Sequence, residues 1–313
     1  MKAYKAFNHD MTCRGFQFEI GKTYTHAGEV SLCNAGFHAC EAPLDVLGYY
    51  PPTALFAEVE MDGVSDEKSS DTKRVGKSIT VKAGLNIAGL VSAQIKWVSK
   101  QADANIASGS YSKAASSGDS SKAASSGDSS TAASSGNYST AASSGNYSTA
   151  ASSGSYSKAA SSGSYSKAAS SGNYSKAASS GDSSKAASSG YSSTAASSGN
   201  YSKAASSGYS STAASSGNSS TAASSGDSST AASSGNYSKA ASSGNSSKAE
   251  ASGKQTVAMV AGCYGQAKAG INGAFALAYK DGEQMRIAVG IVGEDGILAD
   301  TWYRVDAGKL VQA

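Results

Sequence analysis

The chain has 313 residues and a formal net charge of +3, from 26 basic and 23 acidic side chains. This charge is too small for a strong nucleic-acid-binding surface and has the wrong sign for a DNA mimic. The first ten residues lack the apolar segment of a secretory signal, and no apolar run reaches membrane-spanning length. We therefore expect a cytoplasmic protein, or part of a particle assembled in the cytoplasm, with no membrane contact and with reduced cysteines.

Residues 1–108 have an ordinary globular composition, which predicts an N-terminal α+β domain. A short helix is expected at 45–50, because Pro51 and Pro52 would end it. Apolar residues at helical spacing predict an amphipathic helix near 84–99, placed to cap the segment that follows. Strands are expected at about 2–8, 16–24, 54–62 and 78–83.

The middle of the chain is a tandem repeat of nine residues. From Gly109 to Gly262 a glycine falls at every ninth position, over 17 consecutive intervals. One unit reads Gly136-Asn-Tyr-Ser-Thr-Ala-Ala-Ser-Ser, and we number its positions 1 to 9 from the glycine. In the sixteen units from Gly109 to Gly244, position 4 is always Ser and position 6 is always Ala, whereas positions 2, 3 and 5 vary. A fixed period over half of the chain is typical of a repeat architecture.

The alternation of fixed and variable positions predicts a strand with Ser and Ala facing a thin interior and Tyr, Ser, Lys or Thr facing solvent. Glycine, with Asn or Asp after it, would form the corner. Two units per coil would give a flattened β-solenoid over 109–262, with about eight coils at ~4.8 Å each and a length of roughly 40 Å. The alternative is a disordered Gly/Ser linker, but a linker would not confine its substitutions to alternating positions.

The last part of the chain, residues 263–313, predicts a C-terminal antiparallel β cap. Val257, Met259 and Val260 replace the small residues of the repeat, as expected for a hydrophobic closing coil. Strands separated by Asp-Gly or Ala-Gly turns are expected at 274–279, 286–292 and 301–305. The predicted fold is therefore mainly β, a solenoid flanked by an α+β domain and a β cap.

Two N-terminal stretches carry a resemblance to a known group of proteins. They are Cys13-Arg-Gly-Phe-Gln-Phe-Glu-Ile-Gly-Lys-Thr-Tyr and Leu32-Cys-Asn-Ala-Gly-Phe-His-Ala-Cys-Glu-Ala-Pro, which continues to Pro52. They resemble an uncharacterised domain of phage and prophage proteins. Some of these proteins carry a similar nonapeptide array and a tail with a pattern like Asp300-Thr-Trp-Tyr-Arg. The resemblance implies a phage context and no particular mechanism.

Cysteine and histidine residues of the N-terminal domain are the candidate metal ligands. Cys33, His38 and Cys40 are close in sequence, with Cys13 upstream, and three cysteines with one histidine can bind zinc. Their spacing is not that of a standard zinc knuckle. We predict no metal and no cofactor, and buried free cysteines beside a structural histidine.

A second motif of the same domain raises the question of catalysis. Gly36-Phe-His-Ala, followed by Tyr49-Tyr50, is similar to a pattern in ADP-ribosyltransferase-like folds, where such groups hold a nicotinamide. The ordered Arg/His, Ser/Tyr and Glu set of those folds is missing. We therefore predict packing around a short helix, no catalytic residue and a protein that is not an enzyme.

Tyrosine and lysine columns on the solenoid are the predicted binding residues. Residues eighteen apart would stack, so one ladder would hold Tyr138, Tyr156 and Tyr174, and the opposite face would hold Tyr147 and Tyr165. The neighbouring lysines are Lys158, Lys167 and Lys176. Such tyrosines can stack on bases or sugars, or they can simply stabilise the sheet through cross-strand pairs.

Two other uses of a nine-residue repeat fit poorly. Lysines interrupt the threonine column that ice binding would need. Calcium-binding β-rolls need Gly-Gly-x-Gly-x-Asp. Here each unit has one Gly, and the array has only four Asp, namely Asp119, Asp128, Asp182 and Asp227.

The function that this sequence favours is a phage-associated, non-enzymatic repeat protein. Its rigid array would present Tyr, Lys, Thr and Asn columns to a macromolecular partner, most simply a host protein that it binds or blocks. One alternative is a structural or adhesive spacer of the virion, in which the chain could form homo-oligomers. A second is an enzyme or nucleotide-binding protein whose activity lies in residues 1–108. Nucleic acid could bind only through the Tyr and Lys columns.

Overall fold

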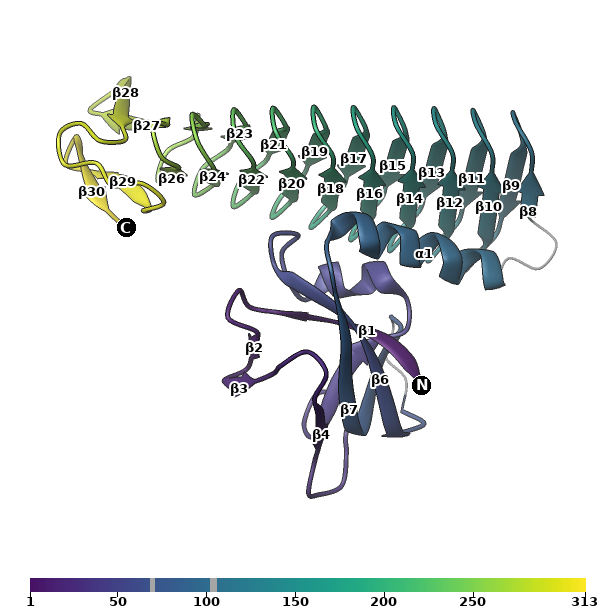
Figure 1. Ribbon diagram of the computed structural model, residues 1–313. Helices are drawn as coiled ribbons and strands as arrows, with labels where there is room; N and C mark the ends of the chain where they lie inside the picture. Colours follow the sequence, from purple (N-terminus) through teal and green to yellow (C-terminus); the bar gives the residue numbers. More distant parts are fainter. Residues whose placement is uncertain (68–70, 102–105) are drawn as a thin grey trace. The chain divides into compact units, whose positions relative to one another are not determined.

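The computed structural model describes residues 1–67, 71–101 and 106–313 (Figure 1). The chain divides into two compact units, Met1–Lys100 and Gln101–Ala313. The repeat array and the C-terminal strands thus belong to one unit. The expected N-terminal domain, 1–108, ends in a region where residues 102–105 lie outside the described residues. Within the described residues, no helix has the length and apolarity needed to span a bilayer.

The first unit is built on a small antiparallel sheet that closes on itself. Its strands are β1 (Lys2–Phe7), β4 (Thr23–Thr25), β5 (Phe37–Cys40), β6 (Leu55–Val64) and β7 (Lys73–Leu85). Neighbours run in the order β4-β7-β5-β1-β6, and the long strand β7 also pairs with β6. Inside the sheet lie Phe7, Val59, Met61, Ile79 and Val81, all fully buried. A separate hairpin joins β2 (Thr12–Cys13) to β3 (Phe16–Gln17).

The expected elements of this unit are mostly confirmed. The strand expected at 16–24 is wrong: β3 ends at Gln17 and β4 begins at Thr23, because Gly21 turns the chain with φ +86°. The short helix expected at 45–50 is a 3₁₀ helix, η1 (Pro43–Gly48). The amphipathic helix is α1 (Ile87–Gln101), and its role as a cap stays a prediction.

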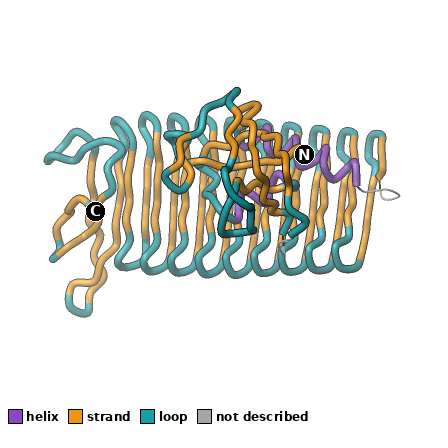
Figure 2. Tube along the Cα trace, turned by 90° about the horizontal axis from the view of Figure 1, so that it is seen from below, coloured by secondary structure: helices purple, strands orange, loops and turns teal. Residues whose placement is uncertain are grey.

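The repeat array is a β-solenoid, as the sequence predicted. Each unit contributes one strand from positions 5 to 9, and each strand pairs in parallel with the strand eighteen residues away, as Thr149 pairs with Lys167. Alternate strands therefore form two sheets that face each other, and turns connect them along both edges (Figure 2). The twenty strands from β8 to β27 make about ten turns, more than the eight expected, because the coils continue beyond the repeat.

The strands of the solenoid have these bounds. The first sheet contains β8 (Ile106–Ser108), β10 (Lys122–Ser126), β12 (Thr140–Ser144), β14 (Lys158–Ser162), β16 (Lys176–Ser180), β18 (Thr194–Ser198), β20 (Thr212–Ser216), β22 (Thr230–Ser234), β24 (Lys248–Ser252) and β26 (Gln266–Ala269). The second sheet contains β9 (Lys113–Ser117), β11 (Thr131–Ser135), β13 (Thr149–Ser153), β15 (Lys167–Ser171), β17 (Lys185–Ser189), β19 (Lys203–Ser207), β21 (Thr221–Ser225), β23 (Lys239–Ser243), β25 (Val257–Val260) and β27 (Ala274–Asp281).

Two residues with positive φ make each turn. In the unit that begins at Gly163, the glycine has φ +113° and Tyr165, at position 3, has φ +58°. The second left-handed residue is thus at position 3, and not at the Asn or Asp of position 2 that the sequence suggested. A left-handed conformation is unfavourable for a tyrosine or serine, so the pairing between coils must hold it in place.

Hydrogen bonds join each turn to the next one along the rod. The Oδ1 atom of Asp128 accepts a bond from the backbone N of Asn146 at 2.9 Å, and the Oδ1 atom of Asn146 accepts one from the backbone N of Ser164 at 3.0 Å. The backbone N of Tyr147 donates to the carbonyl oxygen of Ser164 at 2.9 Å. Where position 2 is Asn or Asp, its side chain forms a ladder of this kind, which satisfies turn amides otherwise left without a partner. In the example above the ladder ends at Ser164.

The interior is filled by positions 4, 6 and 8, which are Ser, Ala and Ser. Ser139 and Ala150 are fully buried, and the hydroxyl oxygens of Ser139 and Ser152 lie 2.9 Å apart across the interior. The hydroxyl of Ser139 also donates to the carbonyl oxygen of Ser153 at 3.0 Å. The interior is thus thin and largely polar, as expected.

Larger apolar residues close the C-terminal end of the solenoid. In the column of interior alanines, Phe275 of β27 follows Ala258 and stacks on Tyr303 with ring centres 5.1 Å apart. Leu277 continues the neighbouring column. Antiparallel pairs then end both sheets, β27 with β28 (Gln284–Ile291) and β29 (Tyr303–Asp306) with β30 (Lys309–Gln312). These strands confirm the expected antiparallel cap.

We predict that the interior cannot accept a larger side chain. Ala150→Leu places three extra carbons between the two sheets and is expected to lower the free energy of unfolding by about 1–3 kcal/mol. The matched control is Ala151→Leu, at the neighbouring outward position, which should change it by less than about 0.5 kcal/mol. Denaturant titration of both variants measures the difference, and equal effects would contradict the assigned inward face.

We also predict that the turn glycine is required. A Cβ atom on Gly163 would collide with the carbonyl oxygen of Gly145 in the preceding coil, and its φ is unfavourable for any other residue. Gly163→Ala is therefore expected to cost about 1–3 kcal/mol. Thermal melts of the two variants measure this cost. Ser164→Ala, one residue further on, is the control and should leave the melting temperature nearly unchanged.

Candidate functional site

The predicted tyrosine ladders exist on the two edges of the solenoid. Rings eighteen residues apart stack with centres 5.0–5.1 Å apart and interplanar angles of 5–10°: Tyr138 on Tyr156, Tyr156 on Tyr174, and Tyr147 on Tyr165. These five rings are 39–62 % exposed. All of them occupy position 3, so the turn itself presents them to solvent.

Sequence reasoning missed the continuation of the first ladder. Tyr191 and Tyr209 stand at position 2, one residue earlier in their units, and their rings stack with centres 5.4 Å apart. Tyr191 also meets Tyr174 edge to face, with centres 6.1 Å apart. The eighteen-residue spacing of Tyr191 and Tyr209 was the signal that could have revealed them.

The predicted lysines do not form one group. Lys158 and Lys176 are neighbours on β14 and β16 of the first sheet, whereas Lys167 belongs to β15 of the second. There it begins a column of three adjacent lysines with Lys185 and Lys203.

The outward surface of the second sheet is a regular face, which we call the alanine–serine face. It consists of positions 5, 7 and 9 of the odd-numbered strands β9 to β23, which carry Lys or Thr, Ala, and Ser. Its five lysines are Lys113, Lys167, Lys185, Lys203 and Lys239, and these outward positions carry no carboxylate. A groove of about 1560 Å³ runs along it, lined mainly by the alanines and serines from Ala115 to Ser243.

Beyond β23 this face changes from polar to apolar. Val257 and Met259 take positions 5 and 7 of β25, and β28 adds a row of alternate residues at the end of the sheet. We call this set the apolar patch, and its members are 42–61 % exposed: Val257, Met259, Met285, Ile287, Val289 and Ile291. The alternation along 285–291 was visible in the sequence, but the side that faces solvent was not.

Strand β28 therefore has its large apolar residues outside and its small or polar residues inside. The inward position of Gly290 lies against the ring of Phe275, which leaves no room for a side chain there. A strand that covers a core normally has the opposite pattern. An exposed apolar row on an end strand is typical of an interaction surface.

The first unit contains a cavity of about 640 Å³, which we call the cationic cavity. Its walls come from β1, the β2–β3 hairpin, β5, the residues after η1 and the start of β7. Among the described residues, its lining includes Lys5, Arg14 and Lys73, both His26 and His38, and no carboxylate. The aromatic walls are Phe16, Phe18, Phe37, Tyr49 and Tyr50.

Lys5 is the most buried of these cations, with 8 % of its surface exposed. Its Nζ donates to the carbonyl oxygen of His38 at 3.0 Å and lies 5.7 and 5.5 Å from the ring centres of Phe7 and Phe18. Burial lowers the pKa of the Lys5 amine, and the charge of Arg14 adds a smaller effect in the same direction.

The cavity also contains the four residues considered as zinc ligands. The Sγ atom of Cys13 accepts a bond from the Tyr50 hydroxyl at 3.0 Å, and the Sγ atom of Cys33 accepts one from the Nζ of Lys73 at 3.0 Å. Burial raises the pKa of Tyr50 to about 12. Of the free cysteines that were predicted to be buried, Cys40 is buried on β5, whereas Cys13 is half-buried and Cys33 is exposed. In the described part of the chain, no three His, Cys, Asp or Glu side chains are grouped so that they could hold a metal ion.

His38 acts as a hydrogen-bond acceptor in the cavity wall. Its Nε2 atom accepts a bond from the backbone N of Cys33 at 2.9 Å. Burial, and then the charges of Lys5 and Lys73, lower the pKa of the imidazole. Both observations describe a neutral ring at pH 7, with its proton on the other nitrogen.

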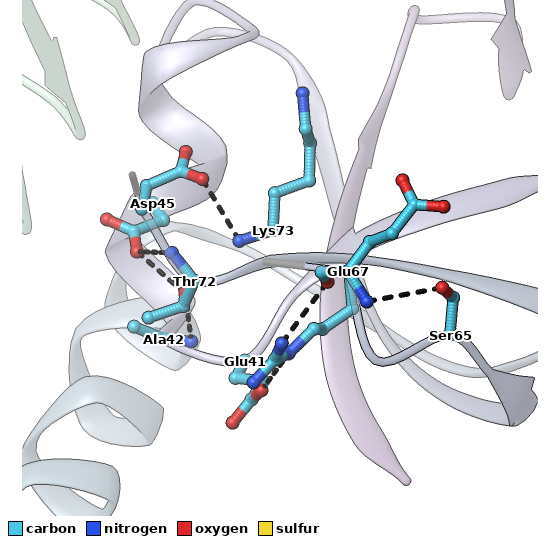
Figure 3. Close-up of polar contacts among 9 residues, drawn as sticks. Glu41, Ala42, Asp45, Ser65, Glu67, Thr72 and Lys73 are labelled. Carbon is cyan, nitrogen blue, oxygen red and sulfur yellow. Dashed lines mark hydrogen bonds and ion pairs between the residues drawn. The ribbon is translucent and has the colours of Figure 1, made fainter. Parts of the chain in front are cut away.

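A polar network joins η1 to the start of β7 (Figure 3). Tyr49 and Tyr50 follow η1 directly, and Lys73 is the first residue of β7. The Oγ1 of Thr72 donates to the Oδ2 of Asp45 at 2.7 Å and accepts a bond from the backbone N of Ala42 at 2.8 Å. Lys73 lies next to Thr72, and its Nζ sits 4.7 Å from the ring centre of Tyr49. The motif residues Gly36 to Ala39 and Tyr49-Tyr50 all line this cavity.

Residues 1–93 match a family described as a domain of unknown function (DUF7666). The match covers the closed sheet, the cationic cavity and the first part of α1, and none of the solenoid. No curated protein and no solved structure matches the chain significantly.

We predict that Lys5 destabilises the first unit at neutral pH. Because burial lowers its folded-state pKa below the ordinary 10.5, the unfolded chain binds more protons between the two values, and stability rises with pH in that window. Lys5→Met should therefore raise the melting temperature by a few degrees at pH 7, and by less as the pH approaches 10.5. Calorimetry of the full chain at both pH values tests this, with exposed Lys22→Met as the control; a pH-independent difference would contradict it.

Proposed function

We propose that this is a phage-associated, non-enzymatic binding protein whose solenoid holds a host protein on the alanine–serine face. The observation that carries the proposal is the apolar patch at the end of this face, where Ile287 and Val289 point away from the core. The phage context is supported by the resemblance of the N-terminal motifs. The complex would form in the cytoplasm of the host.

The charge of the face indicates the chemistry of the partner. Lys167, Lys185 and Lys203 stand side by side on consecutive strands of the sheet, where their like charges repel one another. An acidic segment lying along the column would relieve this repulsion. Facing columns in a second copy of the chain would increase it.

The shape of the face favours an extended segment. The groove has alanine and serine along its length, so its floor is low and regular over the strands from β9 to β23. A partner strand can lie there with its acidic side chains toward the lysines and its apolar residues on the patch. The phosphates of a nucleic acid would neutralise the lysines, but a nucleic acid would not explain the six exposed aliphatic and thioether side chains of the apolar patch.

The tyrosines support a surface role for the edges as well. Position 3 is left-handed in every unit and accepts serine as readily as tyrosine, as Ser129 and Ser183 show. The fold therefore does not require an aromatic ring there, and exposed tyrosines are well suited to protein contacts. They would border the partner on either side of the sheet.

The test uses a photo-crosslinking amino acid at Val289, introduced into the full-length protein in phage-infected cells. We expect one host protein to be crosslinked, and then to bind the wild-type chain when both are purified. Ile287→Thr/Val289→Thr should weaken that binding at least tenfold, because it removes two apolar contacts and keeps β-branched residues in the strand. Ile20→Thr/Leu55→Thr, at exposed apolar sites of the first unit, is the matched control and should not weaken it.

Charge reversal of the lysine column tests the proposal independently of the apolar patch. Lys167→Glu/Lys185→Glu/Lys203→Glu should weaken the same binding and reduce its dependence on salt, whereas Lys22→Glu/Lys77→Glu/Lys309→Glu, with the same net charge, should have little effect. Crosslinks only between copies of this chain would overturn the proposal, as would crosslinks only to nucleic acid.

A further inference from the structure

We propose that the cationic cavity binds a small phosphorylated molecule with a planar ring, of the size of a mononucleotide. The inference is independent of the solenoid and of the partner proposed for it. It rests on the charge, the walls and the volume of the cavity in the first unit.

The charge of the cavity is one-sided. In the part of the chain that the structure describes, Lys5, Arg14 and Lys73 line it, and no carboxylate does. Among the described residues, Lys5 forms no ion pair with a carboxylate. Its ammonium group has three donors, and its partners are the carbonyl oxygen of His38 and the side chain of Cys13. Buried charges in proteins are normally paired, so an unpaired buried lysine in a cavity is suited to an anion.

Lys73 is placed to bind the same anion. It reaches the cavity from the start of β7, where its own backbone N is held by the Oδ1 of Asp71 at 3.1 Å. Its Nζ contacts only the thiol of Cys33 and the ring of Tyr49 among the described residues. Neither contact neutralises the lysine as a carboxylate would. Two ammonium groups and a guanidinium on one cavity suit the doubly charged phosphate of a phosphomonoester.

The walls add a surface for a planar ring. Phe16 and Tyr49 line the cavity and are 46 % and 47 % exposed, although both are large and largely apolar. Phe16 belongs to an aromatic cluster and meets Phe18 with ring centres 4.8 Å apart. Stacking on such rings holds nucleobases in many proteins. The cavity volume of about 640 Å³ lies within the roughly 300–1000 Å³ typical of small-molecule sites.

The experiment is calorimetric titration of the full-length protein with the four ribonucleoside 5′-monophosphates, their nucleosides and inorganic phosphate. We expect at least one monophosphate to bind, and its nucleoside to bind at least tenfold more weakly. Lys5→Met and Lys73→Met should each weaken binding at least tenfold, with Lys22→Met, outside the cavity, as the matched control. Thermal melts show whether each variant is folded. Lys73 is partly exposed, so Lys73→Met tests the proposal even if Lys5→Met does not fold.

Three results would overturn the whole proposal, and a fourth would overturn the part that concerns the planar ring. The first is that no monophosphate binds at millimolar concentration. The second is equal binding of nucleoside and nucleotide, which would remove the role of the cations. The third is equal binding by the wild type and both cavity variants, which would place the ligand elsewhere. Binding of inorganic phosphate with the same affinity as the nucleotide would overturn the role assigned to Phe16 and Tyr49.

Discussion

The solenoid depends on an interior that has room for nothing larger than alanine and serine. Ser139, Ala150 and Ser152 fill one coil, and hydroxyl groups join the two sheets across it. The small apolar area buried this way cannot by itself hold the coils together. Hydrogen bonds between coils must supply much of the stability, through the strand pairs and through the Asn/Asp ladder of the turns. The fixed period follows, because a single extra residue would shift every inward side chain outward.

The same constraint separates structure from function along the sequence. Positions 4, 6 and 8 are determined by the interior, whereas positions 3, 5, 7 and 9 face outward or stand in the turn. The tyrosine stacks, the column around Lys185 and the apolar row with Val289 can therefore vary without loss of the fold. The first unit works differently: its closed sheet positions a few single residues around one cavity, among them the buried Lys5.

The solenoid could be predicted from sequence because its unit is local and repeated, so that eighteen-residue stacking and the Tyr138–Tyr156 ladder follow from spacing alone. The conformation of position 3 could not be predicted, because tyrosine and serine do not prefer a left-handed φ and adopt it here only under tertiary pairing. Only some of the residues that line the cavity could be predicted from the sequence. His38 and Tyr50 attracted attention as motif residues, but Lys5 was missed because it lies in a strand where every position after the first is buried. The outward side of β28 depended on Phe275, whose ring occupies the space behind Gly290.

The thin interior also fixes how the stability of the rod responds to temperature. The heat-capacity change of unfolding grows with exposed apolar surface and falls with exposed peptide surface. The interior of this repeat consists of methyl and hydroxyl groups, such as those of Ala150 and Ser139. Unfolding therefore exposes little apolar surface and much peptide surface. Its stability curve is therefore broad and flat, unlike that of a protein with a large hydrophobic core. The rod therefore keeps nearly the same stability at low temperature as at moderate temperature. Cold denaturation, which follows from a weakening hydrophobic effect, is correspondingly small.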